Sequence, residues 1–202
     1  MPVSRETITL PIYPVQTVVF PGMRLPLTAE PQLPAVVVEA MRHDQPLAVA
    51  LVRRPHGDGV EIPHTIATLA RIIHGPLAAA SARLQLVGVS RIHLLSYRHA
   101  DRYLVGQARF LPDLDEPVSP LLVEEARALG SELWSVVDLG IPYPILPHQP
   151  EAVSYWIAQH LPIDPEERQE LLELRTTTAR LAKEVALLRG LLDSYRSEQI
   201  NP

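Results

Sequence analysis

The sequence predicts an α+β protein in which a small, mostly antiparallel β-barrel precedes a helical half. Three observations support this. Short apolar runs with turn residues between them fill the first half and leave room for one helix. Beyond residues 112–120 the apolar residues recur at helical spacing, and the chain ends in a heptad pattern with one long helix. We therefore expect a β-rich part over 1–115 and a helical part over 116–202.

The first half contains strand candidates separated by turn signals. They lie at 7–13, 17–20, 23–27, 46–52, 65–73, 82–97 and 103–111, with one helix at 31–44. Pro11 interrupts the first candidate, which favours an edge strand or a bulge, because proline cannot donate to a ladder. Pro21-Gly22 has the residues of a type II turn, since proline sets φ and glycine accepts a positive φ. The long candidate is expected to bend near Gly88. Closely spaced strands with a single helix indicate a small barrel.

The second half predicts helices at about 121–139, 151–161 and 165–196. The last begins with Asp164 at the N-cap, Pro165 at N1 and Glu167 at N3. An a/d seam then steps by three and four through Leu171, Leu174, Thr178, Leu181, Val185, Leu188, Leu192 and Tyr195. The seam is short and follows two amphipathic helices that need a partner. We favour packing within the chain, and a homodimer through this helix is the alternative.

Composition excludes several classes of protein. The chain has 202 residues and no cysteine, which excludes disulfides and thiolate metal sites. No secretory signal or apolar run of about 18 residues occurs, so we expect a cytoplasmic protein without a membrane partner. The net charge of −5 divides into +2 over 1–115 and −7 over 116–202. Neither half has the strong positive charge of a nucleic-acid binder.

No motif predicts catalysis or a cofactor. The one lysine, Lys183, lies within the last predicted helix, so a Walker A motif is excluded and a Ser–Lys dyad is not supported. Gly57 and Gly59 lack the third glycine of a dinucleotide fingerprint. We predict no catalytic residues and no cofactor.

Histidines and aromatic residues have structural interpretations. His56 and His64 flank a segment with Asp58 and Glu61, which is the best metal candidate, but we favour a solvated polar loop and predict no metal. Three aromatic residues at helical spacing favour packing between helices over a stacking platform. These are Trp134, Tyr155 and Trp156.

Two blocks of the sequence carry family-specific motifs, the opening LPIYPVQTVVFPGMRLPL (10–27) and LPIDPEERQELLEL (161–174). They resemble LPLFPL-x-x-VLFPG-x-x-LPL and LPLSPEEKQELLEL, which are typical of the N-terminal, substrate-recognition domain of Lon proteases. Further matches are IATLARI (66–72), VGVSRI (87–92), YLVGQARFLPD (103–113) and ARLAKEVALL (179–188). Ala29 departs from the family's aromatic residue and Ala67 from its usual glycine. The likeness runs from about residue 8 to about residue 192.

The resemblance implies a PUA-like β pseudo-barrel joined to a C-terminal helical bundle. In Lon proteases this unit precedes an AAA+ ATPase and a Ser–Lys peptidase, and neither is found in this sequence. We therefore expect a stand-alone, non-catalytic module that binds polypeptides, acting as an adaptor or substrate-recognition factor in protein quality control. Its expected partners are unfolded or tagged polypeptides and an ATPase or protease supplied in trans.

The sequence alone does not decide where the binding surface lies, and it allows one alternative function. Val19, Phe20 and Met23, near the Pro21-Gly22 turn, are candidates for an exposed peptide-binding patch, and barrel core is an equally supported interpretation. The alternative function is RNA binding, since PUA-like barrels elsewhere bind RNA. The only basic residues available for it are Arg53, Arg54, Arg83, Arg91, Arg98 and Arg102. The charge balance argues against that function.

Overall fold

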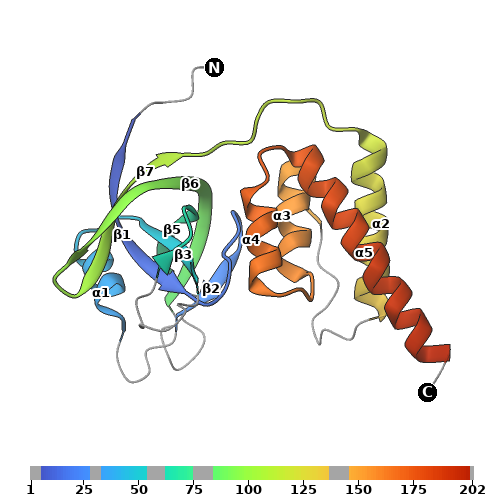
Figure 1. Cartoon of the computed structure of the whole chain (residues 1–202), viewed down its shortest axis with the longest axis horizontal. Coiled ribbons are helices and arrows are strands. Elements are labelled where there is room, and N and C mark those ends of the chain that lie inside the picture. The colour runs from blue at the N-terminus through green and yellow to red at the C-terminus, as the bar shows by residue number, and fades with distance from the viewer. Residues whose placement is uncertain (1–5, 28–32, 54–61, 75–83, 137–145, 201–202) are drawn as a thin grey trace. The chain divides into compact units, whose positions relative to one another are not determined.

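The computed structural model describes residues 6–27, 33–53, 62–74, 84–136 and 146–200. The chain forms two compact units (Figure 1). The barrel unit comprises Met1–Pro112 and Asp164–Glu173, and the helical unit comprises Asp113–Ile163 and Leu174–Pro202. The first junction lies close to the expected boundary at 115/116. The segment 164–173, expected in the helical part, belongs to the barrel unit.

The barrel unit contains a seven-stranded, mostly antiparallel sheet, and with the helices this confirms the predicted α+β fold class. Its strands are β1 (Ile8–Val15), β2 (Arg24–Pro26), β3 (Leu47–Arg53), β4 (Ile62–Pro63), β5 (Ile66–His74), β6 (Leu84–Ala100) and β7 (Tyr103–Phe110). The order is β1-β7-β6-β5-β3-β4, with β2 attached to β6. A parallel pairing of β1 with β3 joins the two sides and closes five strands into a barrel (Figure 1).

The core of the barrel unit has two apolar clusters that share β3. Residues 47–52 are all buried, as the continuous apolar run predicts for a strand covered on both faces. Ala48 and Ala50 belong to one cluster, and Val49 belongs to the other. Helix α1 (Ala35–Arg42) covers the second cluster with Val36, Val37 and Ala40.

Strand β1 corrects the expectation of an edge strand at Pro11. It pairs with β7 from Ile8 to Ile12 and with β3 from Ile12 to Val15, so it lies inside the closed sheet. Each edge of β1 is therefore paired along only part of the strand. Pro11 lies where only β7 pairs with β1, and Pro14 lies where only β3 does. A proline is tolerated at such a position because its missing N–H can face the unpaired side of the strand.

The type II turn at Pro21-Gly22 is confirmed. Gly22 has φ of +83°, and the N–H of Met23 donates to the carbonyl of Phe20 at 3.0 Å. Two bonds join the turn to Gly88 of β6, from Gly22 N to the Gly88 carbonyl at 2.9 Å and from Gly88 N to the Met23 carbonyl at 3.0 Å. The strand expected at 17–20 is absent, because its backbone bonds elsewhere, for example through the Val19 carbonyl to the Thr68 hydroxyl.

The single helix expected over 165–196 is two helices, α4 (Pro165–Glu173) and α5 (Thr177–Ile200). The predicted start of α4 is confirmed, because the N–H of Glu167 donates to Asp164 Oδ1 at 2.8 Å. Thr176 begins α5, its hydroxyl accepting from Ala179 N at 3.1 Å. A threonine hydroxyl serves a helix start better than a helix interior, which explains the break.

The helical unit packs α2 (Pro120–Val136) and α3 (Pro150–His160) against α5. The seam side chains Leu181, Val185, Leu188 and Leu192 are all buried within this chain. Packing within the chain therefore accounts for that part of the seam. Trp134 of α2 lies 5.4 Å from Trp156 of α3 between ring centroids, which confirms packing between helices.

We predict that Gly88→Ala destabilises the barrel unit. A Cβ at this position would lie 2.2 Å from the Phe20 carbonyl oxygen and 3.1 Å from Thr68 Cγ2. Because the obstacle is backbone, we expect a loss of about 1–3 kcal/mol in the free energy of unfolding. Chemical denaturation followed by circular dichroism measures it.

Gly190→Ala in α5 is the matched control. Nothing lies within 4 Å of a Cβ there, and the site is exposed, so the same added methyl should raise helix stability by up to about 1 kcal/mol. Equal stability changes in the two variants would contradict the close contact at Gly88.

Candidate functional site

An open groove of about 470 Å³ lies on the barrel unit beside β1. Three segments build it, namely β1, the start of α1 and the tip of the β6–β7 hairpin. Its main side chains are Tyr13, Pro14, Pro34, Ala35, Arg102 and Tyr103. All of these residues fall within the described part of the chain.

The groove arises where β1 changes its partner strand. β1 and β7 are paired up to Ile12 and Leu104, and beyond Ile12 the strand continues along β3 instead. Tyr13 therefore has no partner on β7, and the space beside it is bordered by the hairpin and by the first turn of α1. The groove is a consequence of closing the barrel.

The walls of the groove are mainly apolar and stiff. Tyr13 and Tyr103 pack against the second core cluster and are partly exposed, and two prolines lie beside them. Aromatic and proline rings offer contact area with little side-chain entropy to lose on binding. Among the described lining residues, the side chains with polar atoms are Tyr13, Tyr103, His99 and Arg102.

The structure corrects two of the three predicted binding residues and leaves Met23 a prediction. Val19 and Phe20 are 2% and 0% exposed, so neither side chain is available to a partner, and the core interpretation applies to both. Met23 is half-buried and packs against the same cluster as Val19. None of the three lines the groove. Tyr13 and Pro14, which do, lie in the same opening segment.

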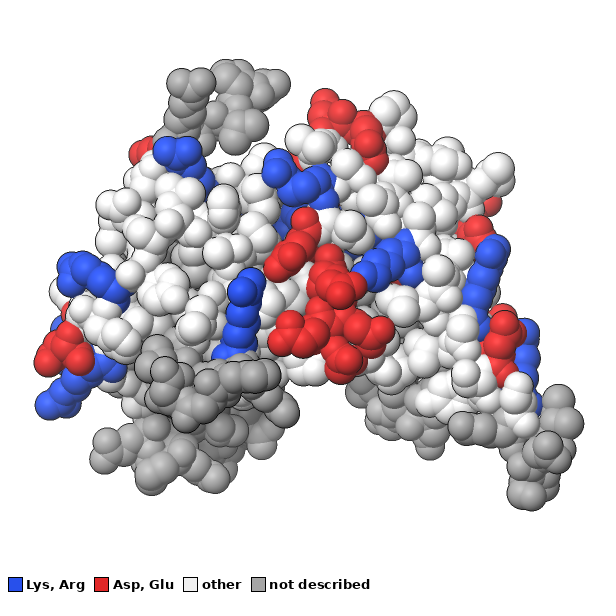
Figure 2. Space-filling view, in the orientation of Figure 1, with Lys and Arg blue, Asp and Glu red and all other residues white. Residues whose placement is uncertain are grey.

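One of the basic residues proposed for RNA binding is buried. Arg91 is 2% exposed and donates from Nη1 to the carbonyl of Leu172, at the C-terminal end of α4, at 2.8 Å. Arg53, Arg98 and Arg102 are exposed, whereas Arg54 and Arg83 lie outside the described residues. Basic side chains are scattered over the face shown in Figure 2. Buried Arg91 serves the fold instead, as a cation at a helix C-terminus.

His64 is buried, which corrects the expectation of a solvated histidine. It is 7% exposed, and its Nε2 and Nδ1 lie 3.3 Å and 3.5 Å from carboxylate oxygens of Glu166 and Glu173 on α4. His56, Asp58 and Glu61 lie outside the described residues. Within the described ranges no group of three His, Cys, Asp or Glu side chains could hold a metal ion. His64 thus faces two carboxylates of α4, and neither of its ring nitrogens has a hydrogen-bond partner among the described residues.

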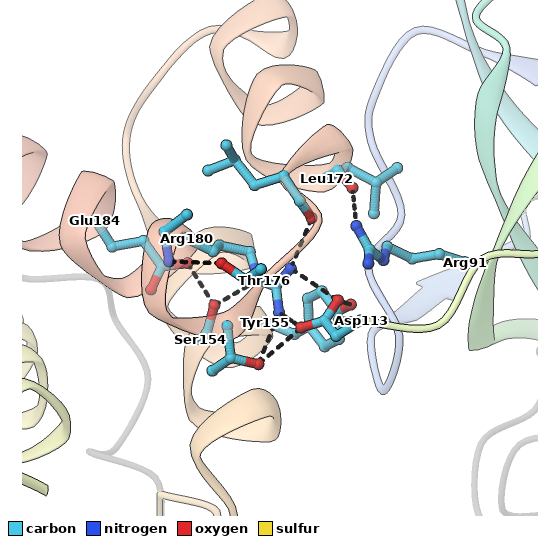
Figure 3. A network of polar contacts seen from close by, with 11 residues as sticks. Arg91, Asp113, Ser154, Tyr155, Leu172, Thr176, Arg180 and Glu184 are labelled. Carbon is cyan, nitrogen blue, oxygen red and sulfur yellow. Dashed lines mark hydrogen bonds and ion pairs between the residues drawn. The ribbon is translucent and has the colours of Figure 1, made fainter. Parts of the chain in front are cut away.

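The helical unit contains a buried polar network around Arg180 (Figure 3). Arg180 is fully buried, with Nη2 2.7 Å from Asp113 Oδ2. Its Nε donates to the Ser154 hydroxyl at 2.6 Å, and its guanidinium lies 4.1 Å from the centre of the Tyr155 ring. The carbonyl of Leu174, just before α5, accepts a further bond at 3.3 Å. The network therefore joins the start of α5 to α3 and to the chain before α2.

Glu184 completes this network without a full set of partners. Ser154 donates to its Oε1 at 2.9 Å, and its Oε2 is buried without a hydrogen bond. Burial raises the pKa of Glu184 well above the ordinary value of 4.5, although the Ser154 hydrogen bond and the Arg180 charge oppose the shift. Ser154, Arg180 and Glu184 are all 0% exposed, so no substrate reaches them. The network is structural.

Comparison with known proteins establishes the family. The family model of the ATP-dependent protease La (LON) substrate-binding domain matches residues 9–190. The chain belongs to this family, which confirms the resemblance found in the sequence.

The curated relatives are named as Lon proteases. The Lon protease of Phenylobacterium zucineum is 28% identical over 92% of this chain, and that of Paraburkholderia phytofirmans is 30% identical over 95%. In both cases the match covers 25% of the relative. The chain thus spans about a quarter of the length of the curated relatives it matches.

Two solved structures show the same fold. A Lon N-terminal domain protein from Xanthomonas campestris superposes with a TM-score of 0.64 at 24% identity, covering 89% of this chain and 98% of that one. The N-terminal domain of the Mycobacterium avium complex Lon protease superposes with a TM-score of 0.63 at 16% identity, covering 90% of this chain and 98% of that one.

Among the described residues, no helix is both long and apolar enough to cross a bilayer.

We predict that Arg180→Leu strongly destabilises the helical unit. The change leaves Asp113 and Ser154 without their buried partner, which should cost about 3–5 kcal/mol of unfolding free energy. Arg189→Leu, on the same helix, removes an exposed pair with Glu125 and should cost less than about 1 kcal/mol. Both tryptophans lie in this unit, so denaturation followed by tryptophan fluorescence compares the two variants. Similar losses would contradict the structural role of the network.

We predict that Glu184→Gln stabilises the helical unit at neutral pH. Because the pKa of Glu184 is raised on folding, the stability that its neutral form provides is present below pH 4.5 and lost as pH rises through the folded-state pKa. Glutamine keeps the acceptor for Ser154 and does not titrate. Urea midpoints across a pH series should be higher and flatter for this variant. Exposed Glu124→Gln is the control, and a lower midpoint for Glu184→Gln at neutral pH would refute the prediction.

Proposed function

We propose that this chain is a polypeptide-binding module and that the groove beside β1 is its binding surface. The observation that carries the proposal is the groove itself, an open apolar channel walled by two tyrosines and two prolines. Membership of a substrate-binding domain family supports the same function. RNA binding has less support, since buried Arg91 is lost from its candidate patch.

The groove favours unfolded over folded polypeptides. An unfolded segment exposes aliphatic and aromatic side chains that a folded protein buries. Placing such a side chain between Tyr13 and Tyr103 removes apolar area from water at about 25 cal/mol per Å². A volume of about 470 Å³ accommodates a few side chains of an extended segment and excludes a folded domain. Selection would thus depend on the client's unfolded state.

The role we propose for such a module is that of an adaptor or substrate-recognition factor. The curated relatives are named as Lon proteases, and this chain matches about a quarter of each. An ATP-dependent protease acting in trans would then degrade the polypeptides that the groove retains. Purification of the native complex would identify that partner.

We predict that Ala35→Gln weakens peptide binding. Ala35 is exposed at the first residue of α1 and lines the groove, so a longer polar side chain there would occupy the channel without disturbing the core. We expect the dissociation constant for a fluorescein-labelled, unfolded casein peptide to rise about fivefold or more, a change of about 1 kcal/mol. Fluorescence anisotropy measures it.

Val38→Gln is the matched control for this prediction. Val38 is 39% exposed on the same helix but does not line the groove. Its variant should bind the peptide as the wild type does. No binding by the wild type at high micromolar concentration would refute the proposed function, and equal weakening by both variants would refute this location.

A further inference from the structure

The charge in the groove is one-sided. Arg102 and His99 are its charged or titratable side chains apart from tyrosine, and no Asp or Glu belongs to its described lining. Both side chains are exposed. In the described part of the chain neither makes an ion pair or a hydrogen bond with another residue. Among the described residues, the groove therefore offers a guanidinium whose donors have no partner, beside an apolar channel.

Arg102 lies in the turn of the β6–β7 hairpin, and the geometry of this turn positions it beside Tyr103. Ala100 and Tyr103 are paired across the end of the β6–β7 ladder, and Asp101 between them has φ of +53°, in the left-handed region. This tight turn places Arg102 directly before Tyr103, and both residues line the groove. Asp101 is exposed and does not line it. A ligand that contacts the Tyr103 ring is then within reach of the Arg102 side chain.

The chemistry of Arg102 selects a carboxylate. Guanidinium donors form a fork that matches the two oxygens of a carboxylate, and such charge-assisted bonds are stronger than neutral ones. The groove is open, so an extended segment can pass through it and present an internal side chain to Arg102. A basic side chain at the same place would be repelled.

We infer that the groove prefers segments in which an Asp or Glu side chain lies next to an apolar residue. The apolar residue contacts Tyr13 and Tyr103, and the carboxylate pairs with Arg102. This inference rests on the proposed function and adds a charge preference to it.

Matched peptides test the inference. Three labelled peptides share one apolar sequence, have amidated C-termini and differ only in flanking residues, which are Glu, Gln or Lys. Fluorescence anisotropy should show the Glu peptide binding about 3- to 10-fold more tightly than the Gln peptide, with the Lys peptide weakest. High salt should reduce the difference, because the pair is exposed.

Two variants assign the preference to its residue. Arg102→Gln should abolish the difference between the Glu and Gln peptides, whatever it does to the affinity for the Gln peptide. Arg98→Gln should keep the preference, since Arg98 is exposed on the same hairpin but lines a different cleft. Circular dichroism should show the same fold for both variants.

The outcomes separate this inference from the proposed function. Binding without a charge preference, or a preference that survives Arg102→Gln, would overturn the inference alone. A further peptide carries Gln and a free C-terminal carboxylate. If it binds more tightly than the amidated Glu peptide, the inference is also overturned, because Arg102 would then bind the terminal carboxylate and not an acidic side chain. Failure of the wild type to bind any of the peptides would overturn the proposed function as well.

Discussion

The parallel pairing of β1 with β3 is the constraint on which the barrel unit depends. Two parallel neighbours cannot be joined by a tight turn, so the chain needs a crossover, and α1 lies on it. To reach β3, β1 must give up β7 at Ile12. The exchange of partner leaves space beside Tyr13, and the crossover brings the first turn of α1 to it. Barrel closure and the groove thus have one cause.

The same crossover explains why the opening segment mixes two tasks. Its first part lies in β1 and supplies Tyr13 and Pro14 to the groove. Its second part must be held against the barrel without belonging to a ladder, and the Pro21-Gly22 turn does this through two bonds to Gly88. Position 88 requires glycine, because the backbone carbonyl of Phe20 occupies the space that a side chain at this position would need. Neighbouring prolines therefore line the groove in one case and turn the chain in the other.

Local signals in the sequence were sufficient for the features that depend on local chemistry. The Pro21-Gly22 turn and the Asp164 cap were predictable, because a few adjacent residues determine each. The groove was not, since it depends on which strands pair across the barrel. The break at Thr176 was obscured by a leucine seam that continues across it, although three consecutive threonines were a signal for a cap. Buried Arg91 was indistinguishable from a surface arginine, because its acceptor lies 81 residues away.

The polar groups are distributed differently in the two units. The buried ion pair, Arg180 with Asp113, lies in the helical unit and, with the Arg180–Ser154 hydrogen bond, holds α5 to α3 and to the chain before α2. Charges fixed so deeply give specific packing but are closed to any ligand. The accessible groove on the barrel unit is instead formed by rings whose positions follow from the sheet, with Arg102 beside them. A surface of that kind gains affinity from burying apolar area, which tolerates many sequences, and a single charge would then decide among them.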